Sequence, residues 1–334
     1  MNAVLIIDKP AGLTSHDVVN RARRILRERS IGHLGTLDPM ATGVLPLVTG
    51  SLTRLAQFYT TSEKTYEGTI RFGFATTTYD AEGESTTTPQ EVLIRAEEIE
   101  TLATRFRGLI EQIPPPFSAK KIKGVPAYKL ARQRKEVILK PVQVEIKEFE
   151  ILEVGSDRVR FRARVASGTY MRSVAHDMGR ELGCGAHLES LRRTAVAEFT
   201  LEDAHTLDEL ATICHPDQNV CHPDRSVPSP TGTESVVGSL PRESEARRGG
   251  PAVAFTETLE ALFIHPRKLL PNFPSVTADE VTVARIRSGR TVNLPELSRA
   301  RQVKVFAGQR ELIAIATRVA GTLFHPKIVL TTES

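Results

Sequence analysis

The chain has 334 residues, 44 of them Lys or Arg and 40 Asp or Glu, so a net charge of +4 allows a nucleic-acid partner without requiring one. A chain this long is expected to fold into more than one domain. It contains no apolar stretch of membrane-spanning length, no signal-peptide pattern, no disulfide framework among its three cysteines, and no Walker lysine or dinucleotide fingerprint. These features predict a cytoplasmic protein and argue against ATP-driven or redox chemistry.

The N-terminal segment is predicted to form a strand followed by a helix. Val4 to Ile7 is a short apolar strand that ends at the turn sequence Asp-Lys-Pro-Ala-Gly. Thr14 and Asp17 have the spacing of a capping box and open a helix that reaches about Glu28. Four arginines lie outside its apolar stripe: Arg21, Arg23, Arg24 and Arg27. They form either an ordinary solvated face or a contact with phosphate.

Residues 31–46, with the sequence IGHLGTLDPMATGVLP, have neither helical nor strand periodicity. Three glycines, two prolines and several apolar residues surround one carboxylate, Asp38. A loop this apolar is expected to pack, which would partly desolvate the carboxylate and make it reactive or dependent on a cationic partner. The alternative is a turn in which Asp38 only hydrogen-bonds local backbone.

The next segments are predicted to be strands and one helix. Apolar residues and Tyr66 alternate with polar residues over 65–72, which indicates a strand with Tyr66 on its apolar side. Residues 91–106 have the pattern of an amphipathic helix, and 142–146 alternate as another strand. Over 158–165 four apolar residues alternate with four arginines, so one strand face would carry four like charges. Either a phosphate backbone or neighbouring acids, such as Glu145, would have to face them.

The remaining chain is predicted to comprise one helix, an insertion and a small barrel. A helix follows Ser167 and ends at Leu182 before Gly183. Residues 214–251 are rich in Ser, Pro and Gly and are predicted to be disordered. They contain the repeat CHPD at Cys214 and Cys221, whose spacing matches no zinc pattern, so no metal site is predicted. The segment 274–330 is predicted to contain a short helix at 278–288, followed by short strands with glycines at the turns. This pattern suggests a small β-barrel.

Seven stretches resemble, in order, the bacterial TruB family of tRNA pseudouridine synthases. They are LIIDKPAGLTSHDVV, GHLGTLDPMATGVLP, KTYEGTIRFG, TTTYDAEG, PPPFSAKKIKGVPAYKLAR, SGTYMRS and GCGAHLESLRRTAVAEF. The resemblance implies an α+β fold, with a mixed, mainly antiparallel sheet and flanking helices in a catalytic domain, plus a small C-terminal β-barrel-like PUA-type domain. We therefore expect a catalytic domain at 1–213, the insertion at 214–251, a connector at 252–273 and a PUA-like RNA-binding domain at 274–334.

The resemblance also implies a set of site residues. Asp38 corresponds to the family's nucleophile, Arg172 to the arginine that pairs with it, and Tyr66 to a tyrosine that stacks on the target uracil and assists proton transfer. The other expected substrate contacts are His33, Tyr170, Leu191, Lys9, Lys64 and Asp80. Arg192 and Arg193 are expected to reach phosphate, and Lys120, Lys121 and Lys123 to add positive charge near RNA. Leu34 departs from the small or hydroxylated residue usual in the family, so altered packing is expected there.

The implied activity is conversion of uridine 55 in the T loop of tRNA to pseudouridine, after the nucleotide is flipped out of its stack. No metal or organic cofactor is needed, and the expected partner is the T arm of tRNA, bound by a monomer. A second hypothesis is an RNA-binding or tRNA-folding protein of the same fold with little or no catalysis. A third, a glycosidase-like hydrolase, lacks an evident second carboxylate near Asp38 in the sequence.

Overall fold

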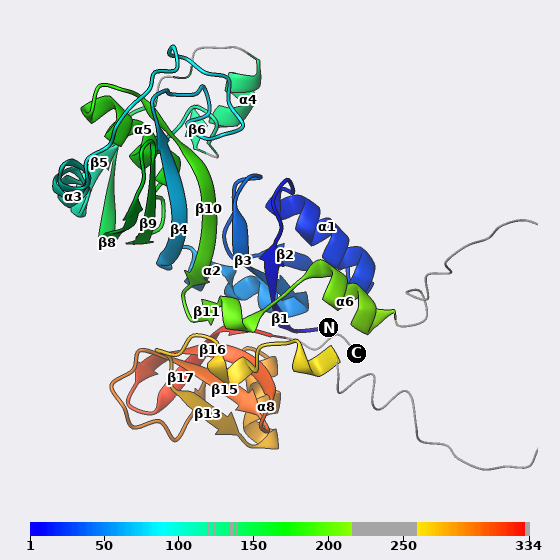
Figure 1. The fold of residues 1–334 in the computed structure, drawn as a ribbon. Helices are drawn as coiled ribbons and strands as arrows, with labels where there is room; N and C mark the ends of the chain where they lie inside the picture. Colours follow the sequence, from blue (N-terminus) through cyan, green and yellow to red (C-terminus); the bar gives the residue numbers. More distant parts are fainter. Residues whose placement is uncertain (119, 123, 134–136, 138, 216–258, 331–334) are drawn as a thin grey trace, which may run out of the picture.

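The protein is described by a computed structural model that covers residues 1–334 except 119, 123, 134–136, 138, 216–258 and 331–334. A ten-stranded sheet and a five-stranded sheet organise the chain, and the helices lie around them (Figure 1). The predicted insertion therefore lies almost entirely outside the described residues, and with it Cys221 of the Cys-His repeat. The predicted domain boundaries stay predictions.

The large sheet is mixed and mainly antiparallel, which confirms the predicted fold class. Its strands are β1 (Val4–Lys9), β2 (Ile31–His33), β3 (Thr42–Thr49), β4 (Lys64–Phe72), β5 (Gly108–Gln112), β8 (Val142–Val154), β9 (Arg158–Val165), β10 (Ala186–Val196), β11 (Phe199–Thr200) and β12 (Ala204–His205). Their order is β12-β1-β3-β10-β4-β9-β8-β5, with β2 beside β3 and β11 beside β10. Among the described pairs, β1–β12 and β3–β10 are parallel.

Helices and a small hairpin complete the N-terminal part. The helices are α1 (Ser15–Leu26), α2 (Ala56–Tyr59), α3 (Ala96–Arg105), α4 (Ala127–Arg132), α5 (Met171–Glu181) and α6 (Leu207–Cys214), with short 3₁₀ turns η1 (Gly50–Leu55) and η2 (Leu201–Asp203). The hairpin is β6 (Lys121–Ile122) and β7 (Val125–Pro126). The predicted cap of α1 is confirmed, because the Thr14 and Asp17 side chains bond each other's backbone N–H groups.

The two faces of the large sheet differ in what covers them. Side chains from α1, α3, α5 and α6 pack with one face of the strands in a single hydrophobic cluster. On β1, Leu5 and Ile7 join that cluster, whereas Val4 and Ile6 point the other way and join a second cluster that includes the C-terminal sheet. Since both faces of β1 are buried, its sequence is continuously apolar rather than alternating.

The solvent face of β4, β8 and β9 carries the four arginines of 158–165. Their partners are acids, which confirms the acidic alternative, although Glu145 is not among them. The pairs join Arg158 to Asp157 and Glu189, Arg160 to Glu153, Arg162 to Glu67 and Glu150, and Arg164 to Glu63 and Glu148. Like charges in one row are thus separated by carboxylates from the same sheet and its end loops.

The helix predicted over 91–106 begins later than expected, at Ala96. Residues 91–95 are not helical, because their backbone bonds to another part of the chain. The N–H of Ile94 donates to the carbonyl of Ser156 at 2.9 Å. Leu93, within this segment, is 80% exposed. The tertiary bond to the β8–β9 turn therefore overrides the local helical pattern.

The C-terminal part is a curved five-stranded sheet that forms a half-barrel, consistent with the predicted PUA-like domain (Figure 1). It contains β13 (Ser275–Ala278), α8 (Glu280–Arg287), β14 (Val292–Asn293), β15 (Gln302–Ala307), β16 (Glu311–Ala320) and β17 (Leu323–Val329), after the turn η4 (Pro266–Lys268). The order is β13-β15-β16-β17-β14. Gly308 and Gly321 make the predicted turns with positive φ.

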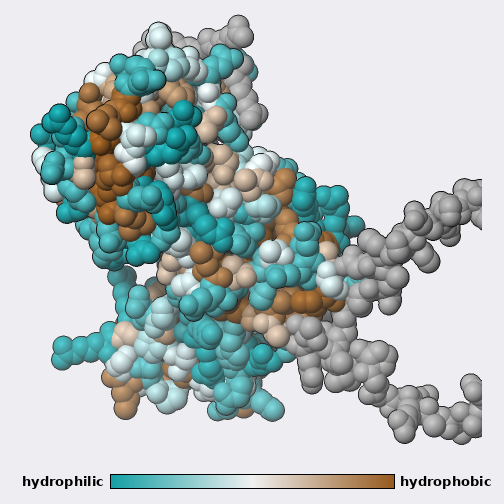
Figure 2. Space-filling view, viewed as in Figure 1, coloured by the Kyte–Doolittle hydropathy of each residue, from teal (hydrophilic) through white to brown (hydrophobic). Residues whose placement is uncertain are grey.

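The visible surface is mainly hydrophilic, with apolar side chains gathered near β5 and α3 (Figure 2). Exposed apolar residues include Leu109 of β5 and Leu152 of β8. β5 is the last strand of the sheet, so it has no further strand to cover it. Within the described residues, no helix has both the length and the apolar character needed to cross a membrane.

Candidate active site

The loop between β2 and β3, residues 34–41, is held by hydrogen bonds from several parts of the chain. Ser15, at the start of α1, accepts from the N–H of Leu37 at 2.8 Å and donates to its carbonyl at 3.2 Å. The N–H of Gly12 donates to the carbonyl of Pro39 at 2.9 Å. As predicted, the loop is packed rather than solvated, and the side chain of Asp38 is 33% exposed. Leu34 is buried in the second hydrophobic cluster, and the altered packing expected there stays a prediction.

Lys9, at the end of β1, hydrogen-bonds the backbone of the same loop. Its ammonium donates to the carbonyls of Pro10 at 2.9 Å, Pro39 at 3.0 Å and Ala41 at 2.6 Å. All three donors are therefore used, and the residue is fully buried. Burial lowers the pKa of Lys9 to about 8, against the opposing charge of Asp38. Its position explains how the loop keeps its shape, while a direct contact with substrate stays a prediction.

Arg172, near the start of α5, makes the predicted pair with Asp38. Its Nε lies 2.9 Å from Oδ2 and its Nη2 lies 2.9 Å from Oδ1, a two-point contact. The guanidinium also donates to the carbonyls of Thr78 at 3.0 Å and Phe117 at 2.9 Å, and Nη1 lies 3.5 Å from a carboxylate oxygen of Asp80. Only 5% of its side chain is exposed. The arrangement fixes the carboxylate of Asp38 in one orientation and balances its charge.

Asp80 is the second carboxylate at this arginine, and its side chain is buried. It is 3% exposed and accepts hydrogen bonds from the Thr78 hydroxyl and from the N–H of Glu82. Burial, and then the charges of Asp80 and Asp38, raise the pKa of Glu82. Since the buried Asp80 and the partly exposed Asp38 share one guanidinium, Asp80 also fixes the position of Arg172.

Two tyrosines predicted to contact the base lie beside Asp38. Tyr66 on β4 is 8% exposed, and its pKa is raised by burial first and also by the charge of Asp38. Tyr170 caps α5, and its pKa is raised by burial and then by Asp38. The buried side chain of Gln112 accepts from the N–H of Tyr170 at 2.8 Å and donates to its carbonyl at 3.1 Å. The sequence did not predict this pair of hydrogen bonds, because a glutamine in an edge strand belongs to no recognisable motif.

The other predicted contacts also lie around the loop. The Nδ1 of His33 accepts from the N–H of Gly35 at 3.3 Å, and burial lowers its pKa. Lys64 donates to the carbonyl of Ser62 at 2.7 Å, and burial, then the charge of Arg193, lowers its pKa to about 8. Leu191 on β10 is 7% exposed. The structure thus brings all nine predicted residues to one region, although their contacts with substrate stay predictions.

Arg193 is not where the sequence analysis expected it. It is fully buried rather than facing phosphate, and it donates to the loop carbonyls of Gly35 at 3.1 Å and Thr36 at 3.2 Å and to that of Val44 at 2.8 Å. The signal was present in the period of the strand, because residues two apart share a face and Leu191 faces the site. Arg192, on the other face, pairs with Asp8 at 2.7 Å and is 42% exposed.

One glycine makes this packing possible. Gly43 pairs with Arg193 across the parallel strands β3 and β10, and a Cβ there would lie 2.2 Å from the carbonyl oxygen of Arg193. Its φ of +100° is also disfavoured for other residues. The end of the loop therefore lies directly on β10.

Comparison with known proteins identifies the family of the chain. The family model "TruB family pseudouridylate synthase (N terminal domain)" matches residues 23–171, and "tRNA pseudouridylate synthase B C-terminal domain" matches residues 172–224. The tRNA pseudouridine synthase B of Solibacter usitatus is 44% identical over 333 residues, 99% of this chain and 100% of the relative. The chain belongs to the TruB family. The member named tRNA pseudouridine synthase B from Aquifex aeolicus is 43% identical over 222 residues, 66% of this chain and 77% of that protein.

Solved structures agree on the fold of this TruB-family chain. A chain of the crystal structure of the archaeal box H/ACA sRNP Nop10-Cbf5 complex matches with a TM-score of 0.64 and 23% identity. The match covers 98% of this chain and 86% of that chain. At this identity the likeness concerns the fold alone. It extends over both sheets, which supports the predicted two-part α+β architecture.

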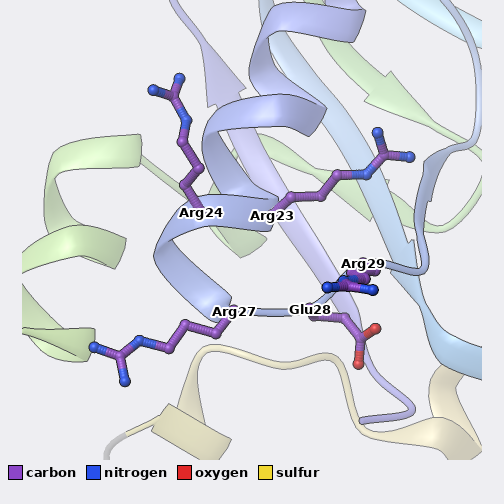
Figure 3. A pocket seen from close by; sticks show the side chains of 5 residues that line it. All are labelled: Arg23, Arg24, Arg27, Glu28 and Arg29. Carbon is purple, nitrogen blue, oxygen red and sulfur yellow. The ribbon is translucent and has the colours of Figure 1, made fainter.

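Away from the loop, four arginines and Glu28 line a hollow at the C-terminal end of α1 of this TruB-family chain (Figure 3). The arginines are Arg23, Arg24, Arg27 and Arg29. Glu28 accepts from the N-terminal ammonium at 2.9 Å, and Arg23 donates to the carbonyl of Ile31 at 2.9 Å. At about 1.5 Å per residue, the last turn of α1 lies roughly 15 Å along the helix from Ser15, which bonds the loop. The phosphate contact considered for these arginines stays a prediction.

The described residues also bear on metal binding. Among them no group of three or more His, Cys, Asp or Glu side chains could hold a metal ion. Cys214 ends α6, and a ring nitrogen of His215 lies 3.1 Å from the carbonyl of Ile25, whereas the second Cys-His pair lies outside the described residues.

Proposed function

We propose that this TruB-family protein converts uridine 55 in the T loop of tRNA to pseudouridine, with Asp38 as the nucleophile. The two-point contact between Asp38 and Arg172 is the observation that carries the proposal. A carboxylate must be ionised to act as a nucleophile, and a buried guanidinium favours that form and orients it. The partly exposed Asp38 remains open to a substrate while its partner is enclosed.

The reaction exchanges one bond for another. The bond between N1 of uracil and C1′ of ribose breaks, and a bond between C5 and C1′ forms, with a proton lost from C5 and one gained at N1. Asp38 assists either by adding to the ribose or the uracil, or by promoting a glycal route. Isomerisation of this kind consumes no external energy and needs no metal or organic cofactor.

The base must leave its stack before Asp38 can reach it. We assign His33, next to the loop, to the space that the nucleotide vacates. Tyr66 would stack on the flipped uracil and assist proton transfer, while Tyr170 and Leu191 would confine the ring as it turns. Buried aromatic and aliphatic side chains suit that task because they hold a flat base without fixing one rotation.

The T arm of tRNA is the proposed binding partner, recognised by a monomer in the cytoplasm. Lys64, Lys9 and Asp80 surround the loop, and the C-terminal half-barrel would contact the RNA further from the uridine. The relatives named tRNA pseudouridine synthase B support tRNA as the substrate.

An assay on unmodified T-arm RNA tests the proposal against an RNA-binding or RNA-folding role. Wild type should form pseudouridine, whereas Asp38→Asn should bind the RNA with similar affinity and form none, because the amide is not a nucleophile here. Asp208→Asn, which changes an exposed carboxylate on α6, is the matched control and should keep full activity. A wild-type protein that binds the RNA without isomerising it would refute the proposal. Release of free uracil would indicate a hydrolase instead.

A further inference from the structure

Arg193 is a buried cation directly opposite Tyr66. The two residues are paired in the antiparallel register of β10 and β4, so their side chains lie on the same face of the sheet, about 5 Å apart at Cβ. Arg193 has no exposed surface. Within the part of the chain that the structure describes, no carboxylate lies at ion-pair distance from its guanidinium.

A buried charge without an ion-pair partner is costly, so each of its donors needs an acceptor. Three are satisfied by the carbonyls of Val44, Thr36 and Gly35. Tyr66 lies opposite on the same face, close enough for the charge of the guanidinium to act on its phenol. One cation therefore bonds the loop that carries Asp38 and lies beside the side chain proposed to stack on the base.

We propose that Arg193 is a positioning residue for Tyr66: by donating to the phenolic oxygen, it turns the hydroxyl hydrogen of Tyr66 away from itself and toward the pocket beside Asp38. The inference rests on the proposed function, because it concerns how Tyr66 meets the uracil. A phenol has one hydrogen to donate, and Arg193 has none to accept with. The Tyr66 hydroxyl can therefore act as a donor to a uracil oxygen.

The electrostatics agree with this geometry. Burial raises the pKa of Tyr66, while the charge of Arg193 and its hydrogen bond act in the opposite direction. The charge of the guanidinium thus favours loss of the phenol proton, and the guanidinium forms no ion pair with Asp38.

A double-mutant cycle with single-turnover kinetics on T-arm RNA tests the inference. Arg193→Met should lower the rate about a hundredfold, the scale of a misplaced catalytic group, with RNA affinity changed less than about threefold. In a Tyr66→Phe background the same substitution should cost about tenfold less, since the oxygen it positions is already gone and only its bonds to the loop remain to be lost. Arg160→Met, at an exposed arginine of β9, is the matched control and should have no effect. Full, additive losses in both backgrounds would overturn the inference.

A second measurement applies even if Arg193→Met does not fold. With ¹³Cζ-labelled tyrosine, Arg193→Lys should shift the Tyr66 resonance and raise the pKa of its phenol, leaving the other tyrosines unchanged. An unchanged Tyr66 resonance would refute the contact. This measurement requires no turnover, so a wild type that forms no pseudouridine would refute the proposed function and leave the Arg193–Tyr66 contact separately tested.

Discussion

Arg172 is the residue on which most of the site depends. Its guanidinium contacts two carboxylates and two backbone carbonyls that come from three separate stretches of the chain. The fork of a guanidinium fits this set, because it presents five N–H donors in one plane. If it is removed, Asp38 and Asp80 lose the guanidinium that contacts both.

We expect Arg172→Lys to lower the single-turnover rate of pseudouridine formation by at least about a hundredfold, because one ammonium cannot reproduce the two-point contact with Asp38. RNA affinity, measured by filter binding, should change little. Arg180→Lys on the same helix is the matched control, since Arg180 is 65% exposed and pairs only with the nearby Asp177 in the described residues. A fully active Arg172→Lys protein would contradict the role given to the pair.

The affinity for RNA should depend on pH through Lys64. Its pKa is lowered to about 8 by burial, so the ammonium loses its charge as the pH rises through that value. The Kd for T-arm RNA should therefore increase between about pH 7 and 9. Lys64→Arg, which stays charged over this range, should flatten the dependence. An identical pH profile for the variant would exclude Lys64 as its source.

At this scale the sequence predicted the pair Asp38 and Arg172, because both lie in motifs that resemble a family. It assigned Arg193 to phosphate, although the period of β10 places this residue on the same face as Leu191. An arginine is usually assigned to the surface, and what removes it from solvent here is a set of loop carbonyls brought together by the fold.

Strand β9 shows how the neighbouring strands decide between two interpretations that the sequence leaves open. Its arginines suited either phosphate or acids, and the acids prevail because β4, β8 and the adjoining loops place glutamates and aspartates beside them. The helix at 91–106 was predicted too long for a related reason, since the backbone bond from Ile94 to Ser156 joins parts far apart in sequence. Strand β4 was predicted correctly because its alternation is local.

Arg162→Met should leave the free energy of unfolding nearly unchanged, since its pair with Glu67 is solvent-exposed. RNA affinity should be unchanged, because the row of arginines is already neutralised by acids. Denaturant unfolding and filter binding measure the two quantities. A marked loss of RNA affinity would revive the phosphate interpretation of this strand.

On the scale of the whole molecule, the two sheets share a hydrophobic cluster. Val4 and Val48 of the large sheet pack in it with Phe306 and Ile315 of the half-barrel. Polar contacts support the junction: the hydroxyl of Tyr59 donates to Glu198 at 2.6 Å, and the same carboxylate accepts from the N–H of Leu270 at 2.9 Å. The two parts are therefore expected to unfold together.

Calorimetry on the full chain should accordingly show one cooperative unfolding transition. Tyr59→Phe should lower the free energy of unfolding by about 1 kcal/mol, because it removes one hydrogen bond from Glu198 at this junction. Phe58→Leu, which alters a neighbouring ring without touching that carboxylate, serves for comparison. Two well-separated transitions would show that the shared cluster does not couple the sheets.

The shared cluster has a consequence for which RNAs can be modified. Because the half-barrel packs against strands next to the loop that carries Asp38, the distance between the two is expected to vary little, and a bound RNA would have to match it. A stem too short or too long to reach from one to the other would present the wrong nucleotide, so the protein would select its target by length as well as by the sequence of the loop.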